Sequence, residues 1–410
     1  MSNPFRPISI SFIPNYSLPD VLQAFLLLCQ PWNYFNTSWT DQFSTALKNY
    51  IQRKHVILFE SGRDAEYFLL KALGIKSGDE VIIQAFTCVA VPNSTLWNGA
   101  KPVYVDIDES FNIDPQKLER LVTSKTKAVI VQHTLGTPAK IAAIAEICRK
   151  NKIILLEDCA HGFGNSLNGK KLGSFGLATF YSFGRDKVIS GVWGGAVKTD
   201  DESLALKLED LAKVLPQRSF GWVVMQLGYI LASAFILETY SFFNLGKMTH
   251  LALHKAGLLS LVIKSPEKQG EHPEKFYKGP VGALAYLANI QLQKIDDFIV
   301  HRKKLARFYS NELGADFNEE SSYLRFPLLV TDPNSLRKFA AKKNIFLGDW
   351  YDTVIAPIGT NIEAIGYKKG SCSVAERISE RIVNLPTNPK LSLKGAAKVV
   401  AVVKLWKSKK

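Results

Sequence analysis

The chain has 410 residues with a formal net charge of +14, and 47% of the residues are hydrophobic and 21% charged. This composition excludes an intrinsically disordered chain, and the length suffices for two or three domains with a large core. No helix-turn-helix, zinc-finger or RNA-binding aromatic motif accompanies the basic residues, so nucleic acid is not the expected partner. An anionic membrane surface or a phosphorylated small molecule fits the charge at least as well.

Alternating strands and helices are predicted over the first half of the chain. Residues 19–52 have apolar side chains at helical spacing, with a break near Pro31. Short apolar runs then predict strands at residues 56–59, 80–83, 102–105, 128–131, 153–158, 178–183 and 195–198. Such strands, separated by helical stretches, are typical of a mostly parallel, doubly wound α/β sheet.

The organisation of the whole chain follows from these elements. An N-terminal helical segment is expected at residues 1–55, and the sheet forms a large domain at residues 56–200. Residues 201–282 form an apolar helical insertion that ends in a polar linker near residues 265–270. One long helix at residues 283–313 then opens a smaller α+β domain at residues 283–410.

The apolar insertion allows three interpretations. Residues 220–237 contain one strongly polar residue, Gln226, and are long enough for a membrane-span candidate, and a second apolar run covers residues 251–263. A single span is disfavoured because it would place the sheet and the last domain on opposite sides of the bilayer. The segment is then either buried, in the core or between subunits, or it lies in the membrane interface. We predict peripheral membrane contact through residues 220–263, helped by the lysine-rich C-terminus, with burial between subunits as the competing interpretation.

The cysteines and the N-terminus bear on the compartment. The five cysteines are an odd number and lack the spacing of metal ligands, which predicts free thiols, a reducing compartment and no metal site. The first residues do not resemble a secretory signal. A cytoplasmic location is therefore expected, with contact to the inner face of the membrane through the insertion.

Two charged residues stand at the carboxyl ends of predicted strands. Asp158 ends the strand at 153–158, and Lys187 follows the strand at 178–183. Ligands of open α/β sheets bind at this edge. Pyridoxal phosphate (PLP) uses such a pair, because a lysine forms an imine with its aldehyde and a carboxylate keeps its pyridine nitrogen protonated. A lone lysine in this place would be an ordinary loop residue, so it is the pairing with Asp158 that favours a cofactor site.

Phosphate-binding features occur in two places. Ser61 and Gly62 join a strand to a helix that begins with Arg63 and Asp64, and backbone amides at such a helix start bind phosphate. Alone, a Ser-Gly pair before a helix is more often only a cap. Ser182 adds a hydroxyl at the strand end that carries Lys187, and the two features together favour a site for a cofactor phosphate.

Ordered motifs give the chain a family resemblance. They are Ser61-Gly-Arg-Asp-Ala65, Glu157-Asp-Cys-Ala-His161, Tyr181-Ser-Phe-Gly-Arg-Asp-Lys187, Val374-Ala-Glu-Arg377 and Asn384-Leu-Pro386. In these motifs the chain resembles the DegT/DnrJ/StrS family of nucleotide-sugar aminotransferases, which are PLP enzymes of fold type I. The resemblance implies a three-layer large domain with a mostly parallel sheet and a smaller C-terminal α+β domain.

The resemblance also implies roles for individual residues. Lys187 would be the Schiff-base lysine and proton shuttle, Asp158 the partner of the pyridine nitrogen, and His161 a neighbour of the cofactor's 3-oxygen. The phosphate would be held by Ser61, Gly62, Arg63, Asp64 and Ser182. His133 matches a family histidine below the cofactor region, and a purely structural role is equally expected for it.

Three departures from the family pattern concern the substrate pocket and the subunit interface. Cys88 stands where the family stacks an aromatic ring on the pyridine, so either this thiol covers the ring or Phe86 moves in. Residues 276–281 replace the family's Tyr-Asn-x-Arg segment. Residues 191–195 differ from its Gly-Glu-Gly-Gly motif.

The expected activity is the transfer of an amino group from glutamate or glutamine to a keto sugar carried on a nucleotide, by a homodimer. PLP-dependent sugar dehydration is a related alternative, but family members of that kind carry histidine in place of the lysine. A non-enzymatic alternative is a membrane-attached regulatory or scaffold protein on a non-catalytic aminotransferase fold. The joint presence of Asp158, Ser182 and Lys187 favours the enzyme.

Overall fold

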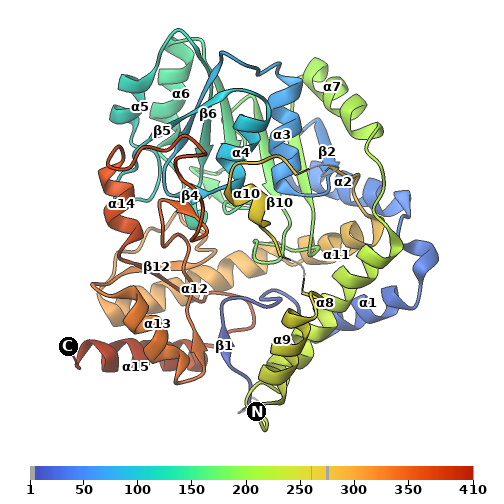
Figure 1. Cartoon of the computed structure of the whole chain (residues 1–410), viewed down its shortest axis with the longest axis vertical. Coiled ribbons are helices and arrows are strands. Elements are labelled where there is room, and N and C mark those ends of the chain that lie inside the picture. The colour runs from blue at the N-terminus through green and yellow to red at the C-terminus, as the bar shows by residue number, and fades with distance from the viewer. Residues whose placement is uncertain (1–4, 260, 274–276, 410) are drawn as a thin grey trace.

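A seven-stranded sheet forms the centre of the protein in a computed structural model that describes all residues except 1–4, 260, 274–276 and 410 (Figure 1). In spatial order its strands are β2 (His55–Phe59), β11 (Gly195–Thr199), β10 (Ala178–Ser182), β7 (Ile154–Asp158), β6 (Thr126–Gln132), β3 (Glu80–Gln84) and β5 (Lys101–Val105). β11 runs antiparallel to both of its neighbours, and the remaining pairs are parallel. The parallel strands therefore end at one edge, where β7 and β10 deliver Asp158 and Ser182.

Helices cover both faces of this sheet. One face packs against α3 (Gly62–Ala72), α4 (Ala90–Trp97) and α7 (Glu202–Lys213). The other packs against α2 (Thr37–Ile51), α5 (Pro115–Leu121), α6 (Ile141–Lys150) and α11 (Gly282–Leu292). Because both faces of the sheet are buried, the strands have continuous apolar sequences. These runs are the reason that the strands could be predicted from the sequence.

The C-terminal part is a smaller α+β unit. It contains α12 (Ile295–Leu313), β12 (Phe326–Leu329), α13 (Pro333–Ala341), β13 (Ile345–Phe346), β14 (Ile355–Ala356), α14 (Ser373–Ser379), β15 (Ile382–Leu385) and α15 (Leu393–Lys407). β12 and β15 pair antiparallel, and α12, α13 and α15 enclose a common core with them. β14 pairs with the short strand β4 (Thr87–Cys88), and β13 pairs with β1 (Ile8–Ser9), so this unit is tied to both earlier parts of the chain.

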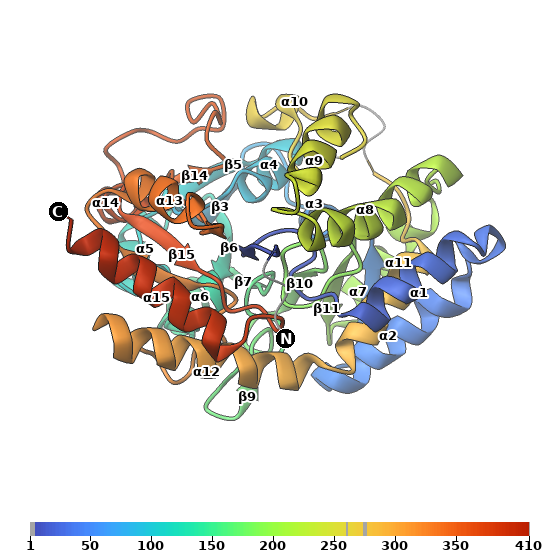
Figure 2. The same cartoon turned by 90° about the horizontal axis from the view of Figure 1, so that it is seen from below.

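The single helix predicted at residues 283–313 is wrong, because the structure has two helices. Lys294 leaves helical backbone geometry between α11 and α12, and its ammonium group binds the buried carboxylate of Asp20 at 2.7 Å. The break lets α11 pack on α2, while α12 packs against α15 (Figure 2). The two N-terminal helices, α1 (Leu18–Leu28) and α2, are separated by a 3₁₀ turn at Pro31–Asn33, as predicted.

The insertion contains α8 (Phe220–Glu238), α9 (Leu245–Lys255) and α10 (Ser265–Lys268). Outside the insertion, β8 (Ser166–Leu167) and β9 (Lys170–Lys171) form a small hairpin. The predicted polar linker is wrong in part, since α10 occupies it and the Glu267 carboxylate caps the backbone of Lys264 at 2.8 Å. α8 meets the length and hydropathy criteria for a span, with a mean hydropathy of 1.8, but 39% of that window is buried in the fold. It packs along α1 in a shared apolar cluster. The domain limits at residues 56, 200 and 282 stay predictions.

Candidate active site

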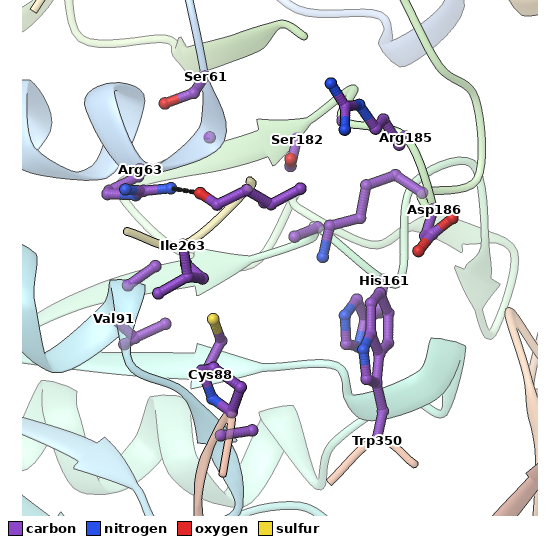
Figure 3. Close-up of a pocket in the computed structure, with 18 of the residues that line it drawn as sticks. Ser61, Arg63, Cys88, Val91, His161, Ser182, Arg185, Asp186, Ile263 and Trp350 are labelled. Carbon is purple, nitrogen blue, oxygen red and sulfur yellow. Dashed lines mark hydrogen bonds between the residues drawn. The ribbon is translucent and has the colours of Figure 1, made fainter. Parts of the chain in front are cut away.

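A cavity of about 480 Å³ lies at the carboxyl edge of the sheet, between the large domain and residues 349–358 of the C-terminal unit (Figure 3). The predicted site residues that line it are Ser61, Gly62, Arg63, Cys88, Asp158, His161, Ser182 and Lys187. Asp64 does not line it: its carboxyl group faces a neighbouring cavity of about 440 Å³. The structure therefore brings together all but one of the residues that the sequence pointed to.

Lys187 sits in the loop that follows β10. The Asn15 side chain donates hydrogen bonds to the carbonyl groups of Lys187 (2.7 Å) and Val188 (3.0 Å), and Arg302 donates to Asn15 at 2.8 Å. Burial lowers the pKa of the Lys187 ammonium group, although Asp158 opposes this effect. A lysine with a lowered pKa has more neutral amine at a given pH, and the neutral amine is the nucleophile.

Asp158 ends β7 inside the cavity wall. Its carboxylate accepts a hydrogen bond from the backbone N–H of Ala160 at 2.9 Å, which fixes its orientation. Burial raises the pKa of Asp158, whereas the Ala160 N–H and Lys187 act in the opposite direction. A cationic ring nitrogen placed against this carboxylate would favour its ionised form.

The phosphate end of the cavity is built by α3. Ser61 caps the helix, since its hydroxyl accepts the N–H of Asp64 at 3.1 Å. Gly62 lies so close to β10 that a Cβ there would come within 2.6 Å of the Ser182 Cβ. Glycine thus lets the N-terminus of α3 approach the Ser182 hydroxyl, and the helix dipole and free N–H groups suit a phosphate at this point.

The Arg63 side chain is directed differently from the predicted phosphate contact. Its guanidinium group forms a buried ion pair with Glu267 of α10. It also donates a hydrogen bond to the Val262 carbonyl at 3.0 Å, drawn as a dashed line from Arg63 in Figure 3. Asp64 is buried as well, and burial raises the pKa of its carboxyl group to about 8. The Arg63 side chain therefore attaches the insertion to the rim of the cavity. A phosphate contact by either side chain stays a prediction.

His161 and Trp350 form one wall of the cavity. Their rings stack with centroids 5.0 Å apart and an interplanar angle of 9° (Figure 3). The Nδ1 atom of His161 accepts the backbone N–H of Leu135 at 3.2 Å, so the hydrogen of the neutral ring is on Nε2. Burial, assisted by Lys187, lowers the pKa of His161 well below its usual value. His161 is thus a neutral donor, which suits a hydrogen bond to an anionic oxygen.

Cys88 and Phe86 lie in different places relative to the cavity, and which of them covers a bound ring stays a prediction. The Cys88 side chain is half-buried and lines the cavity. Phe86 is fully buried, is not among the residues that line the cavity, and packs edge-on against Tyr351 at 5.4 Å. Trp350 is one of several aromatic residues that line the cavity, and its ring centre lies 4.9 Å from the Lys187 ammonium nitrogen.

Sequence reasoning missed three residues that shape the site. Asn15 and Trp350 lie far from Lys187 in the chain, and no local pattern marks them. Gln226 had a signal, as the single strongly polar residue of a long apolar run. It is fully buried and accepts hydrogen bonds from Arg185 and Trp193, both at 2.9 Å. Because these partners flank Lys187, α8 supports the active-site loop.

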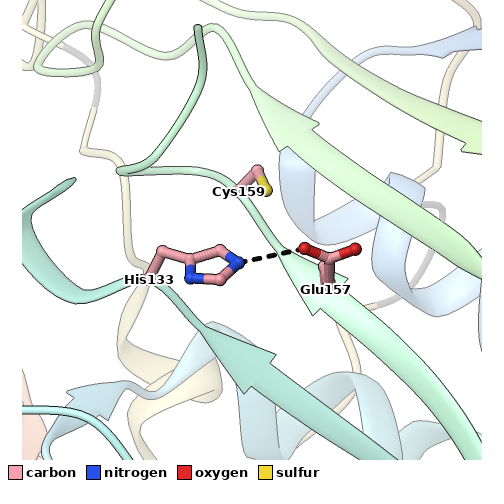
Figure 4. A group of neighbouring side chains, drawn as sticks. All are labelled: His133, Glu157 and Cys159. Atoms are coloured by element: carbon pink, nitrogen blue, oxygen red, sulfur yellow. Dashed lines mark hydrogen bonds and ion pairs between the residues drawn. The ribbon is translucent and has the colours of Figure 1, made fainter. Parts of the chain in front are cut away.

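His133, Glu157 and Cys159 form a buried group beneath the cavity (Figure 4). The Nδ1 atom of His133 accepts the Ala139 N–H at 3.1 Å, so Nε2 donates to the Glu157 carboxylate, also at 3.1 Å. Glu157 also accepts three backbone N–H groups from residues 173–176. The hydrogen bonds of this group thus hold the loop that leads into β10, which is a structural role.

Lys198 of β11 lies near this group and yields a prediction on stability. Its ammonium group is buried, finds no hydrogen-bond partner among the described residues, and has its pKa lowered by burial from 10.5 to about 8. Below pH 8 the folded protein carries a buried charge that the unfolded chain keeps in water, and this penalty disappears as the pH rises towards 10.5. Lys198→Met should therefore raise the free energy of unfolding by about 3 kcal/mol at pH 7.

Denaturant unfolding of the unchanged protein and of Lys198→Met, between pH 6 and pH 10.5, measures this effect. The range includes the pKa of Lys198 in the folded protein, about 8, and its usual value of 10.5. The gain should shrink above pH 8. Lys213→Met, at a lysine whose side chain is 68% exposed, is the matched control and should change little. A gain that is constant across the pH range would contradict the assignment to the buried charge.

The residues present fit PLP as the cofactor. A half-buried lysine, a buried carboxylate and a helix N-terminus meet on one cavity wall, with a neutral histidine donor beside them. Bound there, PLP would supply an aldehyde for amine exchange and an electron-accepting ring. Lys187 would attach it and carry the proton at the reacting carbon, Asp158 would hold the ring nitrogen, and Ser61, Gly62 and Ser182 would hold the phosphate. This fold and site define the class of PLP-dependent transferases of fold type I.

Comparison with known proteins agrees with this class. The sequence model of the DegT/DnrJ/EryC1/StrS aminotransferase family matches residues 28–223 and 283–404. A pleiotropic regulatory protein of Geobacillus stearothermophilus is 27% identical over 379 residues, which cover 91% of this chain and 90% of that protein. A dTDP-3-amino-3,6-dideoxy-alpha-D-galactopyranose transaminase of Aneurinibacillus thermoaerophilus is 26% identical over 401 residues and 94% of each chain.

Among solved structures, PseC of Helicobacter pylori, an aminotransferase involved in the biosynthesis of pseudoaminic acid, superposes with a TM-score of 0.75. The match has 21% identity and covers 98% of this chain and 100% of that one. The chain therefore belongs to the DegT/DnrJ/EryC1/StrS aminotransferase family. The predicted family, fold and enzyme class are confirmed.

Proposed function

We propose that the protein transfers an amino group from glutamate or glutamine to a keto sugar carried on a nucleotide, with PLP attached to Lys187. The observation that carries the proposal is the convergence of Lys187, Asp158 and the N-terminus of α3 on one cavity. The transaminase relative acts on a sugar linked to dTDP by its name, which supports a nucleotide sugar as the acceptor.

The chemistry divides into two half-reactions at this site. Bound PLP would accept the amino group of the donor, which would leave as the matching 2-oxo acid, and would pass that group to the sugar ketone. In both directions the neutral Lys187 amine would take and return the proton at the reacting carbon, while Asp158 would hold the ring nitrogen. Apolar side chains also line the cavity, with Val91, Val192, Ile263 and Ile358 among them. Such a lining keeps water away from the reacting carbon.

A regulatory function on the same fold is the second candidate, because the relative from Geobacillus stearothermophilus, which matches most of the chain, is named a regulatory protein. The two candidates differ in whether the bound cofactor turns over. Lys187 and Asp158 are both present and line the cavity, Lys187 half-buried and Asp158 buried, which supports catalysis.

One experiment separates the candidates. Protein loaded with PLP is mixed with glutamate or glutamine, and the conversion of the bound cofactor is followed by absorbance. A panel of nucleotide 3-keto and 4-keto sugars is then added, and amino sugars are detected by mass. We expect conversion and an amino sugar from at least one acceptor. Conversion without any amino sugar would refute the nucleotide-sugar acceptor, and no conversion with either donor would favour the regulatory function.

We also propose a homodimer, as the family resemblance implies. Light scattering of the loaded protein at the assay concentration should give twice the chain mass of 45.7 kDa. An active monomer would refute this part of the proposal and leave the assigned reaction untouched.

A further inference from the structure

The insertion carries a surface segment with a one-sided charge. Between Glu238 and Glu267 the sequence has no acidic residue, whereas it has Lys247, Lys255 and Lys264. The two flanking acids are already paired, Glu238 with Arg6 at 2.9 Å and Glu267 with the buried Arg63. We call residues 239–264 the basic apolar segment. Its positive charge is not balanced by acids of its own.

The same segment exposes large apolar side chains. α9 buries only Gly246, so the helix lies on the protein with little of its own surface covered. At least 41% of the surface is exposed for each of Phe242, Phe243, Leu245, Met248, Leu251, Leu258, Leu261 and Val262. Clustered exposure of this kind marks an interaction surface on a folded protein.

The basic apolar segment lies outside the residues that the family model matches. The family match ends at residue 223 and resumes at residue 283, so the whole segment lies in the gap. Figures 1 and 2 show α9 beside α8, on the other side of the molecule from the end of α15. The C-terminal lysines are therefore not counted in this surface, and the predicted help from them stays a prediction.

We propose that residues 239–264 dock the protein on an anionic lipid bilayer. Exposed apolar side chains insert at the boundary between headgroups and acyl chains, and Lys247 and Lys255 of α9 bind the anionic headgroups. This assignment does not depend on the proposed reaction, because docking needs neither cofactor nor sugar.

A second copy of the chain fits this surface less well. A twofold interface places the same patch on both subunits, so each copy would bring Lys247 and Lys255 to the interface without any acid of the segment to pair with. The chain as a whole has a formal net charge of +14, which adds repulsion. An anionic bilayer removes both problems.

The docking surface continues into the active-site cavity. Val262 and Ile263 lie near the end of the basic apolar segment, and both line the cavity. Ile358, which is 64% exposed, lines it with them. Arg63 holds this end of the segment through Glu267 and the Val262 carbonyl. The mouth of the cavity therefore opens at the edge of the surface assigned to the membrane.

Co-sedimentation of the full-length protein with vesicles tests the proposal. Vesicles of phosphatidylcholine alone are compared with vesicles that also contain phosphatidylglycerol, at low and high salt. We expect pelleting with the anionic vesicles that weakens at high salt. The double variant Lys247→Glu/Lys255→Glu should lower the partition coefficient of the protein onto the anionic vesicles at least ~10-fold. Lys398→Glu/Lys407→Glu on α15 is the control with the same change of charge, and it should leave the partition unchanged.

A variant of the apolar side chains separates lipid from a second copy. Met248→Ser/Leu251→Ser should reduce pelleting while the mass by light scattering without lipid stays that of the unchanged protein, because both side chains are exposed. A lower mass in this variant would show that copies of the chain cover the surface, and would overturn the proposal. Absence of pelleting with anionic vesicles, or equal loss in the α15 control, would overturn it as well.

Discussion

Replacing Lys187 by alanine is expected to remove the visible absorbance of the lysine-bound cofactor and to lower transamination at least about a hundredfold. The variant loses both the amine that attaches the cofactor and the group that moves the proton. The backbone contacts from Asn15 to the carbonyl groups of Lys187 and Val188 do not need the lysine side chain, so the fold should remain. Absorbance spectra and single-turnover rates with glutamate or glutamine measure the effect.

The control for this change is Lys170→Ala, at an exposed lysine of β9. It should keep both the absorbance and the rate. If Lys187→Ala retained the visible band, another lysine would hold the cofactor and the assignment would be wrong. Circular dichroism confirms that a loss of activity is not a loss of folding.

Asp158→Asn is expected to slow the first half-reaction by about 10- to 150-fold. The asparagine keeps the size of the side chain but removes the negative charge that holds a protonated ring nitrogen, and charge-assisted hydrogen bonds contribute about 1.5–3 kcal/mol. A ring nitrogen without this partner makes the cofactor a weaker electron acceptor. Single-turnover rates with the amino donor, measured after full loading with PLP, report this step separately from binding.

Asp210→Asn is the matched control, because Asp210 is exposed on α7 and remote from the cavity lining. It should have the rate of the unchanged protein. Near-normal turnover of Asp158→Asn would mean that a different acid serves the ring nitrogen. Glu66 would be the first to examine, because it lines the same cavity and is buried.

The parts of the site that the sequence predicted are those in which a local pattern determines the position. Asp158 and Ser182 each end a buried apolar strand, and parallel strands bring such ends to one edge. Ser61 and Gly62 form a helix start whose geometry depends on neighbouring residues. The fold itself was equally accessible, because apolar runs alternate with amphipathic helices.

The parts that were missed depend on contacts between distant segments. The direction of the Arg63 side chain is set by Glu267, and Glu267 lies in a segment that the sequence suggested was a linker. Trp350 reaches the cavity because β14 pairs with β4, a contact between two-residue strands with no pattern of their own. The break at Lys294 depends on Asp20 in the first helix. Local periodicity contains none of this information.

The N-terminal residues before α1 connect three regions of the molecule. β1 pairs with β13, the Ile13 carbonyl accepts a hydrogen bond from Lys390 at 3.2 Å, and Asn15 holds the lysine loop. None of these residues lines the cavity. Proteolytic trimming up to Ser17 would therefore leave every cavity-lining side chain in the protein and still release the loop that presents Lys187. Purified protein should therefore be checked for an intact N-terminus. A clipped sample would contain every residue that lines the cavity but would lack the Asn15 hydrogen bonds that hold the Lys187 loop.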